Sequence, residues 1–171
     1  VYSEVLPGST LFAGGLPDHV KGVVLSGSPR SVYEENAPSP DPALLTFGVP
    51  VLGICYGFHQ LVQISGGAVS PRETKEFGRA AVHFEKPSPL FGGVPDGFVS
   101  WMSHGDSIGQ LPESFEVSAR SESFIAAAKH TERQIYGIQF HPEVTHCEYG
   151  TKILENFATV ISGASAEWTM D

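Results

Sequence analysis

The stretch Gly48-Val-Pro-Val-Leu-Gly-Ile-Cys-Tyr-Gly57 decides the fold class of this chain. Residues 49–54 form a short apolar run, typical of a buried strand, that ends abruptly in Gly-x-Cys-x-Gly. This pattern is the thiol counterpart of the nucleophile elbow, in which a strand turns sharply into a helix and exposes one side chain. Glycines two positions before and after the nucleophile let other segments approach that strained backbone. The stretch therefore predicts an α/β sheet with Cys55 as its nucleophile.

A helix is expected directly after the elbow. Residues 58–64 are apolar and of helical length, and Gly66-Gly67 ends the run. The positive end of a helix favours the thiolate form of a cysteine, which is the nucleophilic form. A buried structural cysteine at a strand end is the alternative. The flanking glycines and the switch from strand to helix favour the nucleophile.

Length and composition restrict the remaining possibilities. The 171 residues suit one domain, and 41% hydrophobic with 17% charged residues is typical of a globular protein. The net charge of -9 argues against nucleic-acid binding, and no apolar run approaches the roughly 20 residues of a membrane span. Cys55 and Cys147 form no disulfide framework, so we expect a reducing, cytoplasmic compartment. Because the chain begins at Val1, we expect a processed protein, a separate subunit or an excised fragment.

The first third of the chain predicts two strands, a loop and a short helix. Residues 1–6 suggest a short strand, and Gly22-Val-Val-Leu25 is typical of a buried parallel strand. The latter runs into Ser26-Gly-Ser-Pro29, a turn at a strand's carboxyl end, where open α/β sheets place their sites. After a proline-rich surface loop over residues 34–42, Asp41 is expected to cap a short helix.

The second half of the chain predicts a meander of strands and a closing helix. Short runs rich in phenylalanine, valine and alanine, separated by Gly, Pro and Ser turns, predict strands. These strands cover residues 80–84, 98–102, 115–119, 124–128 and 134–140. Apolar residues recur at helical spacing between Gly150 and Ile161. The order of the elements predicts a three-layer α/β domain.

A second strand end supplies a base for the cysteine. A cysteine nucleophile needs a histidine to accept its proton and a third group to orient that histidine. His141 follows a predicted strand, and neighbouring parallel strands would bring it to the same edge as Cys55. In an extended chain Glu143 lies on the same side as His141 and would bond the far nitrogen of the imidazole. A surface turn is the alternative for His141-Pro-Glu143, and the elbow makes it the weaker one.

The attack of a thiolate on a carbonyl also needs an oxyanion hole. Backbone N–H groups form such a hole, one from the residue after the nucleophile and one from a neighbouring strand–helix loop. Here these groups belong to Tyr56 and to the Gly27-Ser28 turn. The predicted reaction is acyl transfer through a thioester, on an ester, amide or peptide carbonyl.

Two other clusters are weaker candidates. His141, Glu143, His146 and Cys147 carry ligand-type side chains, but their spacing matches no common structural zinc pattern, so we predict no metal site. On sequence alone, Trp101-Met-Ser-His104 is more typical of a strand end with a hydrogen-bonded histidine.

The motifs together resemble the class I, or triad, glutamine amidotransferases. Gly53-Ile-Cys-Tyr-Gly57 and Gln139-Phe-His-Pro-Glu143 carry this resemblance. Further segments are similar to the amidotransferase domain of the GMP synthases and extend over nearly the whole chain. They are Leu25-Ser-Gly-Ser-Pro29, Ser31-Val-Tyr-Glu-Glu-Asn-Ala-Pro38, Phe77-Gly-Arg-Ala-Ala81, Trp101-Met-Ser-His-Gly-Asp106, Tyr136-Gly-Ile-Gln-Phe-His-Pro-Glu-Val-Thr-His146 and Trp168-Thr-Met170.

The resemblance implies one amidotransferase domain over residues 1–171, with a flavodoxin-like fold, a mainly parallel central sheet and extra antiparallel strands. It implies hydrolysis of L-glutamine to glutamate and ammonia by Cys55, His141 and Glu143. The ammonia would serve a partner ATP-pyrophosphatase domain or subunit that converts XMP to GMP, and residues 162–171 resemble the start of a linker to it. ATP and Mg²⁺ would bind only to that partner, so no cofactor is expected here.

The resemblance also implies substrate contacts. Gly27 would line the site, and Ser103, Gly105 and Asp106 would lie near the amino-acid end of glutamine. His59 stands where the family has a glutamine that holds the substrate, and we expect weaker glutamine binding from this change.

Two further departures from the family pattern concern the backbone. Ser28 replaces the second glycine of a Ser-Gly-Gly-Pro turn, which costs on the order of 1 kcal/mol if that position needs a positive φ. The family's first strand and helix are absent before Val1, and we expect their absence to affect folding.

Two alternative functions remain open from the sequence. Another cysteine hydrolase on this fold, such as a γ-glutamyl peptidase or a different amidotransferase, would use the same triad. A regulatory or binding module with weakened catalysis is suggested by Ser28, His59 and the absent first strand.

Overall fold

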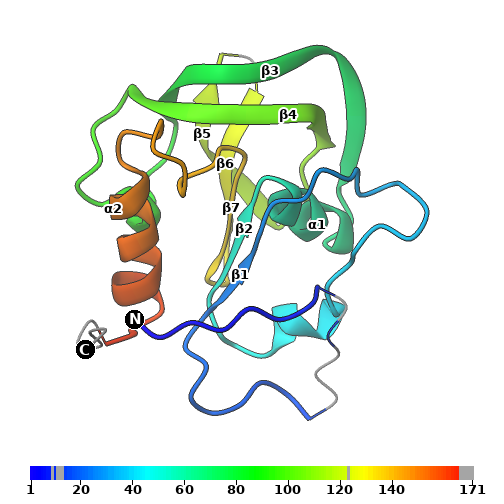
Figure 1. The fold of residues 1–171 in the computed structure, drawn as a ribbon, viewed down its shortest axis with the longest axis vertical. Coiled ribbons are helices and arrows are strands. Elements are labelled where there is room, and N and C mark those ends of the chain that lie inside the picture. Colours follow the sequence, from blue (N-terminus) through cyan, green and yellow to red (C-terminus); the bar gives the residue numbers. More distant parts are fainter. Residues whose placement is uncertain (9, 11–13, 123, 166–171) are drawn as a thin grey trace.

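Figure 1 shows the computed structural model, which describes residues 1–8, 10, 14–122 and 124–165, with the backbone alone for residues 72–76. Seven strands are assigned in the described residues. They are β1 (Val23–Leu25), β2 (Val51–Ile54), β3 (Ala68–Phe84), β4 (Phe98–Gln110), β5 (Phe115–Ser121), β6 (Phe124–His130) and β7 (Ile135–Ile138). The helical segments are η1 (Pro42–Thr46), α1 (Tyr56–Ile64), η2 (Pro89–Phe91), α2 (Gly150–Glu155) and the π-helical η3 (Asn156–Ile161).

The strands form one mixed sheet in the order β1-β2-β7-β6-β5-β3-β4. Strands β1, β2 and β7 pair in parallel, whereas the other four pairings are antiparallel. The predicted α/β class is confirmed, but the predicted mainly parallel character is restricted to the β1-β2-β7 end. This end matters for function because neighbouring parallel strands finish at one edge, where their following residues meet.

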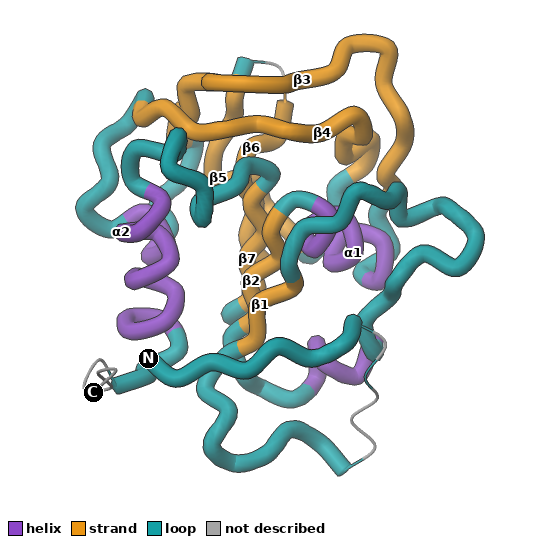
Figure 2. The backbone as a smooth tube through the Cα atoms, in the orientation of Figure 1, coloured by secondary structure: helices purple, strands orange, loops and turns teal. Residues whose placement is uncertain are grey.

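The predicted three layers are present. Figure 2 shows helical segments on either side of the strands. On one face Ile153 and Phe157, from α2 and η3, pack in a core cluster with Leu52 and Ile138. On the other face Phe58 of α1 packs in a second cluster, which also contains Leu61, Val51 and Ile135. Alternate residues of β2 therefore feed two separate cores, as expected for a strand covered on both faces.

Close contact between α1 and the sheet depends on a glycine in β7. A β-carbon at Gly137 would lie 1.9 Å from Cδ2 of Phe58, inside the aromatic ring's contact distance. Phe58 is fully buried, so no larger residue fits opposite it without moving the helix. Because α1 begins directly after Cys55, this packing also sets the position of Cys55 relative to β7.

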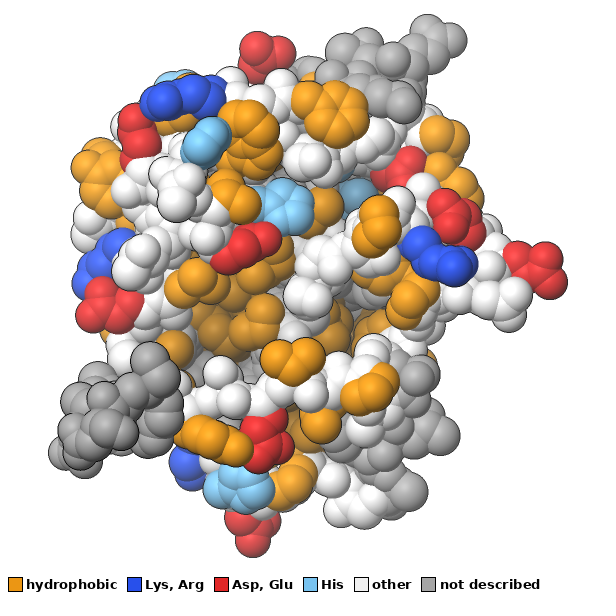
Figure 3. All heavy atoms as spheres, in the orientation of Figure 1, with side chains coloured by type: hydrophobic (Ala, Val, Ile, Leu, Met, Phe, Trp, Pro, Cys, Tyr) orange, Lys and Arg blue, Asp and Glu red, His pale blue; other side chains and the backbone are white. Residues whose placement is uncertain are grey.

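Two predictions for the first third of the chain are wrong. Residues 1–6 form no strand and are exposed, with Val5 98% accessible to solvent. Strand β1 is parallel, as predicted, but it lies at the sheet edge and is not buried, since Val24 is 47% exposed. Other hydrophobic side chains also face solvent: on the face drawn in Figure 3, they line a hollow near the centre. An apolar pattern predicts a strand, but its burial depends on which segments cover it.

Other local predictions are confirmed. Asp41 caps η1, because its Oδ1 accepts a hydrogen bond from the Ala43 N–H at 3.0 Å. Helix α1 ends before Gly66, whose φ of 88° suits glycine. The closing helix covers the predicted residues 150–161, although its second half widens into a π-helical turn. Among the described residues, no helix combines the length and hydropathy needed to cross a membrane.

Candidate active site

Cys55 occupies the sharp turn between β2 and α1. Its φ of 51° and ψ of -106° are unusual for a residue with a side chain, and such strain concentrates at functional positions. The Cys55 N–H donates to the Ile138 carbonyl at 2.8 Å, which anchors the turn to β7. A β-carbon at Gly57 would lie 2.0 Å from the Leu25 carbonyl oxygen, so the start of α1 touches the end of β1. The elbow geometry predicted from Gly-x-Cys-x-Gly is present.

His141 reaches the cysteine from the neighbouring strand. The register pairs Gly53 of β2 with Gly137 of β7 in parallel, so both chains leave the sheet at the same edge. The His141 N–H donates to the Trp101 carbonyl at 3.1 Å and fixes the segment after β7. The pKa of His141 is raised to about 9, mainly by its hydrogen bond with Cys55 and also by Glu143, against the opposing effect of burial. This arrangement favours an imidazolium beside the sulfur.

Glu143 orients the imidazole from its far side. Its Oε1 lies 2.7 Å from Nδ1 of His141, which leaves Nε2 for the cysteine. The side chain of His141 is 18% exposed and that of Glu143 is 50% exposed, so solvent reaches the carboxylate. The structure therefore brings together the three residues that the sequence predicts as a triad.

The predicted oxyanion hole has the expected neighbours. Tyr56 is the first residue of α1, a position whose N–H has no intrahelical partner. On the other side lies the turn after β1, where a β-carbon at Gly27 would be 3.1 Å from Cε1 of His141 and 3.9 Å from Cβ of Cys55. The described non-glycine residues with a positive φ are Asn36, Cys55 and Glu122. Because Ser28 is not among them, its side chain imposes no left-handed strain on the turn.

Strand β4 borders the cysteine from above. The Ser103 carbonyl oxygen lies 3.9 Å from Sγ of Cys55. Farther along β4, the Asp106 carboxylate accepts hydrogen bonds from the Ser31 hydroxyl and from the Tyr33 hydroxyl, the latter at 2.8 Å. These bonds tie the loop after β1 to β4. Gly105, which the resemblance also places near the substrate, precedes Asp106 on the same strand. The Nδ1 atom of His104 lies 2.8 Å from the Asp106 carbonyl, so the predicted hydrogen-bonded histidine is present, but it lies inside β4 and not at a strand end.

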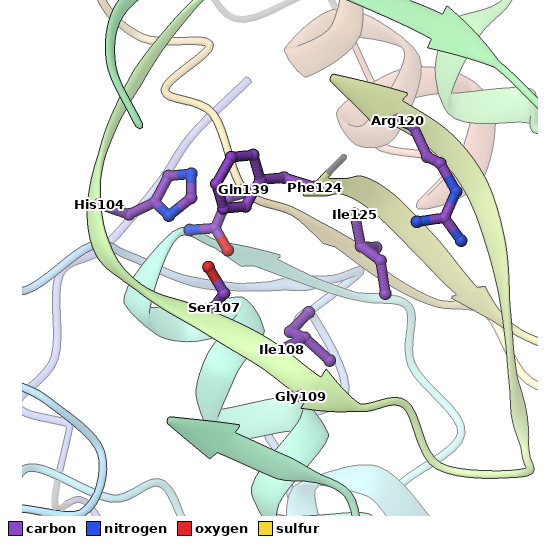
Figure 4. A pocket seen from close by; sticks show the side chains of 8 residues that line it. All are labelled: His104, Ser107, Ile108, Gly109, Arg120, Phe124, Ile125 and Gln139. Carbon is purple, nitrogen blue, oxygen red and sulfur yellow. The ribbon is translucent and has the colours of Figure 1, made fainter. Parts of the chain in front are cut away.

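His59 and Gln139 form a buried pair beneath the cysteine. His59 is 3% exposed, and its Nε2 lies 2.7 Å from Oε1 of Gln139. Gln139 also places its Nε2 3.7 Å from Sγ of Cys55. The sequence places Gln139 in a motif but assigns it no role, because its contacts join residues 80 and 84 positions apart. Figure 4 shows Gln139 at the wall of a pocket of about 190 Å³, facing His104 and Ser107.

The family model described as glutamine amidotransferase class-I matches residues 2–161. The chain belongs to this family.

Named relatives of this amidotransferase are GMP synthases. It is 51% identical over 173 residues to GMP synthase [glutamine-hydrolyzing] of Yarrowia lipolytica and 48% identical over 170 residues to that of Gloeobacter violaceus. The alignments cover 100% and 99% of the chain but only 32% and 31% of the relatives. The amidotransferase chain thus spans about a third of the length of these curated relatives.

Solved structures agree with this assignment. A protein described as a putative GMP synthase subunit, from Thermoplasma acidophilum, superposes with a TM-score of 0.70 at 31% identity. That match covers 85% of the amidotransferase and 74% of the archaeal chain. A glutamine amidotransferase from Methylobacillus flagellatus, at 20% identity and a TM-score of 0.59, shares the fold over 90% of this chain.

The second cysteine of the amidotransferase is a poor nucleophile. Cys147 is 7% exposed, and burial raises the pKa of its thiol to about 11. Both cysteines are free thiols. In the part of the chain that the structure describes, no group of three or more His, Cys, Asp or Glu side chains is arranged to hold a metal ion. Only Cys55 combines a thiol with a histidine and a helix N-terminus.

Proposed function

We propose that this chain is a glutaminase that hydrolyses L-glutamine to glutamate and ammonia. The observation that carries the proposal is the placement of Cys55, His141 and Glu143 at the carboxyl ends of adjacent parallel strands. The 2.7 Å bond between His141 and Glu143, and the raised pKa of His141, support the charges that such a triad needs. Membership of the class-I amidotransferase family supports glutamine as the substrate.

In the proposed mechanism, the Cys55 thiolate attacks the γ-amide carbon while His141 holds the proton. The oxygen of the tetrahedral intermediate accepts hydrogen bonds from the N–H groups of Tyr56 and Ser28. As the C–N bond breaks, His141 gives its proton to the departing nitrogen and ammonia leaves. His141 then accepts a proton from water, whose oxygen attacks the thioester and releases glutamate and the thiolate. The sequence of steps requires no metal or cofactor in this domain.

The residues around Cys55 would also contact the substrate glutamine. Gly27 lies close beside the triad, the Ser103 carbonyl borders Cys55, and Gly105 and Asp106 follow on the same strand, β4. The amino-acid end of glutamine would lie against this segment. Because Asp106 already accepts bonds from Ser31 and Tyr33, the loop after β1 would position that carboxylate for the substrate ammonium.

A labelling experiment tests the nucleophile and the substrate together. A diazoketone analogue of glutamine should modify Cys55 and abolish glutamine hydrolysis, and glutamine should protect against the modification. Cys55→Ala should lose both labelling and activity, whereas Cys147→Ala should keep both. Labelling of the Cys55→Ala variant would contradict the proposal. Faster turnover of γ-glutamyl peptides than of glutamine would instead indicate a peptidase.

We infer that the ammonia serves a partner of GMP synthase type. The named relatives are GMP synthases, of which this chain spans about a third, so their remaining part has room for an ATP-pyrophosphatase domain. That partner, with ATP and Mg²⁺, would convert XMP to GMP. Mixing the chain with such a domain should give glutamine-dependent GMP formation. Binding without turnover would point to a regulatory module.

A further inference from the structure

Gln139 is the buried polar residue that lies directly against the reactive sulfur. It is 1% exposed, and its N–H donates to the Ala126 carbonyl of β6 at 2.9 Å, so its backbone is anchored to β6 directly after β7. Its side-chain amide bridges two groups, with Oε1 toward His59 at 2.7 Å and Nε2 toward Cys55 at 3.7 Å. A sulfur acceptor allows this longer distance because its radius exceeds that of oxygen.

The orientation of this amide decides whether it helps or opposes a thiolate. With Nε2 toward the sulfur, Gln139 presents a donor, which stabilises negative charge. With the amide turned over, the carbonyl oxygen would face the sulfur and repel it. The Ser103 carbonyl, 3.9 Å away, already offers an acceptor that favours the protonated thiol. The Gln139 amide therefore offsets the effect of this carbonyl by offering the sulfur a donor.

His59 fixes this orientation when its Nε2 carries the proton. It is 3% exposed, and burial lowers its pKa, so the imidazole is neutral and carries one N–H. A proton on Nε2 gives a hydrogen bond to Oε1 of Gln139 and leaves the Gln139 amide hydrogens for Cys55. The turned-over amide would place two donors against each other. His59 sits on α1, which begins directly after Cys55 and packs closely against Gly137, so the pair is positioned by the same helix as the elbow.

We propose that Gln139 is a catalytic residue that donates a hydrogen bond to the Cys55 thiolate, and that His59 is a positioning residue that acts through Gln139. The proposal rests on the proposed function only for its effect on glutamine hydrolysis, because reactivity of Cys55 is measurable without glutamine. It gives His59 a role in stabilising the Cys55 thiolate, in place of the substrate contact that the family resemblance implies. Other titratable groups near the pair are His141 and Glu143 after β7, and His104 and Asp106 on β4.

The test measures how fast iodoacetamide alkylates Cys55 as a function of pH, by mass spectrometry of the peptide that contains it. The thiolate displaces iodide in this reaction, so the rate follows the thiolate fraction. Gln139→Met keeps the volume but removes the donor. It should slow alkylation at pH 7 about tenfold or more, as expected for losing a hydrogen bond to a charged group. The half-maximal rate should move to higher pH.

Variants of His59 separate positioning from substrate binding. His59→Gln keeps a donor near the place of Nε2 and should alkylate at nearly the wild-type rate. His59→Leu removes the donor and should slow alkylation several-fold. The double variant His59→Leu/Gln139→Met should react no more slowly than Gln139→Met alone, because His59 acts only through Gln139. In glutamine hydrolysis, all losses should appear in kcat with KM unchanged.

Each outcome decides the proposal. An unchanged alkylation profile in folded Gln139→Met, or a raised KM with unchanged alkylation in His59→Leu, would overturn it. If Gln139→Met does not fold, the comparison of His59→Leu with His59→Gln decides, since equal alkylation rates in both would also overturn it. A wild-type chain without glutaminase activity would refute the proposed function, while the alkylation series would still test the role of Gln139.

Discussion

Gly27 and His141 touch across the edge of the sheet, because a β-carbon at Gly27 would lie 3.1 Å from Cε1 of the imidazole. The same β-carbon would lie 3.9 Å from Cβ of Cys55. The turn after β1 therefore limits the space on one side of the triad, and the histidine can keep its position between Cys55 and Glu143 only while this neighbour is small.

Gly27→Ala should lower activity more than stability. The added methyl group would displace His141 by a few tenths of an ångström and loosen its alignment with the sulfur. Small misplacements of catalytic groups are costly, so we expect glutamine hydrolysis to fall about tenfold. Gly14→Ala is the control, because a β-carbon there meets nothing within 4 Å. Steady-state kinetics and thermal unfolding of both variants check this expectation, and an unchanged kcat in Gly27→Ala would contradict it.

Glu143→Gln should reduce kcat while leaving the fold intact. The amide keeps a hydrogen-bonding group near Nδ1 of His141 but removes the charge that stabilises the imidazolium. We expect a loss of roughly a hundredfold, less than for a fully buried triad carboxylate, because Glu143 is half exposed. Glu113→Gln serves as a control at an exposed acidic position. A kcat within twofold of wild type would show that Glu143 does not orient the base.

Local patterns predict the elbow and the proximity of Cys55, His141 and Glu143. Gly53, Cys55 and Gly57 stand in one short segment, and the turn needs them at that spacing. The meeting of Cys55 with His141 follows from two strand ends and the rule that parallel strands finish at one edge. These inferences need only local sequence and one rule of sheet geometry.

Features that depend on tertiary neighbours are not predictable in the same way. The bond between His59 and Gln139 joins residues 80 positions apart and depends on the tautomer and rotamer of two buried side chains. Strand β3 begins at Ala68, whereas the sequence predicts a strand only over residues 80–84, because Pro71 and the charged residues after it interrupt the apolar pattern. Burial of β1 depends on which segment covers Val24, and the strand's own residues do not specify that.

Gly57→Ala should destabilise the fold rather than alter the chemistry alone. Its β-carbon would lie 2.0 Å from the Leu25 carbonyl oxygen, a backbone atom that cannot rotate away. Helix α1 and strand β1 would have to separate, with an expected cost of about 1–3 kcal/mol or more. Gly92→Ala is a matched control, since its nearest contact is also a carbonyl oxygen, that of Pro89, at 3.4 Å. Equal unfolding midpoints in urea for the two variants would contradict the prediction.

The stability of the protein should fall as the pH rises from about 6.5 to about 9. The pKa of His141 is raised to about 9 in the folded chain, first by its hydrogen bond with Cys55, against about 6.5 for an unfolded histidine. A raised pKa means that the folded state holds the proton more tightly. The stabilisation is therefore complete below pH 6.5 and disappears as the pH passes 9.

The size of this effect has an upper limit of about 3–4 kcal/mol, because the pKa rises by about 2.5 and each pKa unit corresponds to about 1.4 kcal/mol. Thermal unfolding between pH 6.5 and 9.5 should show a steeper decline for wild type than for His141→Gln, which cannot titrate there. Cys55→Ser should also flatten the decline, since a hydroxyl does not ionise in this range and the imidazolium loses its main partner. Parallel pH profiles for all three proteins would mean that the proton on His141 does not stabilise the fold.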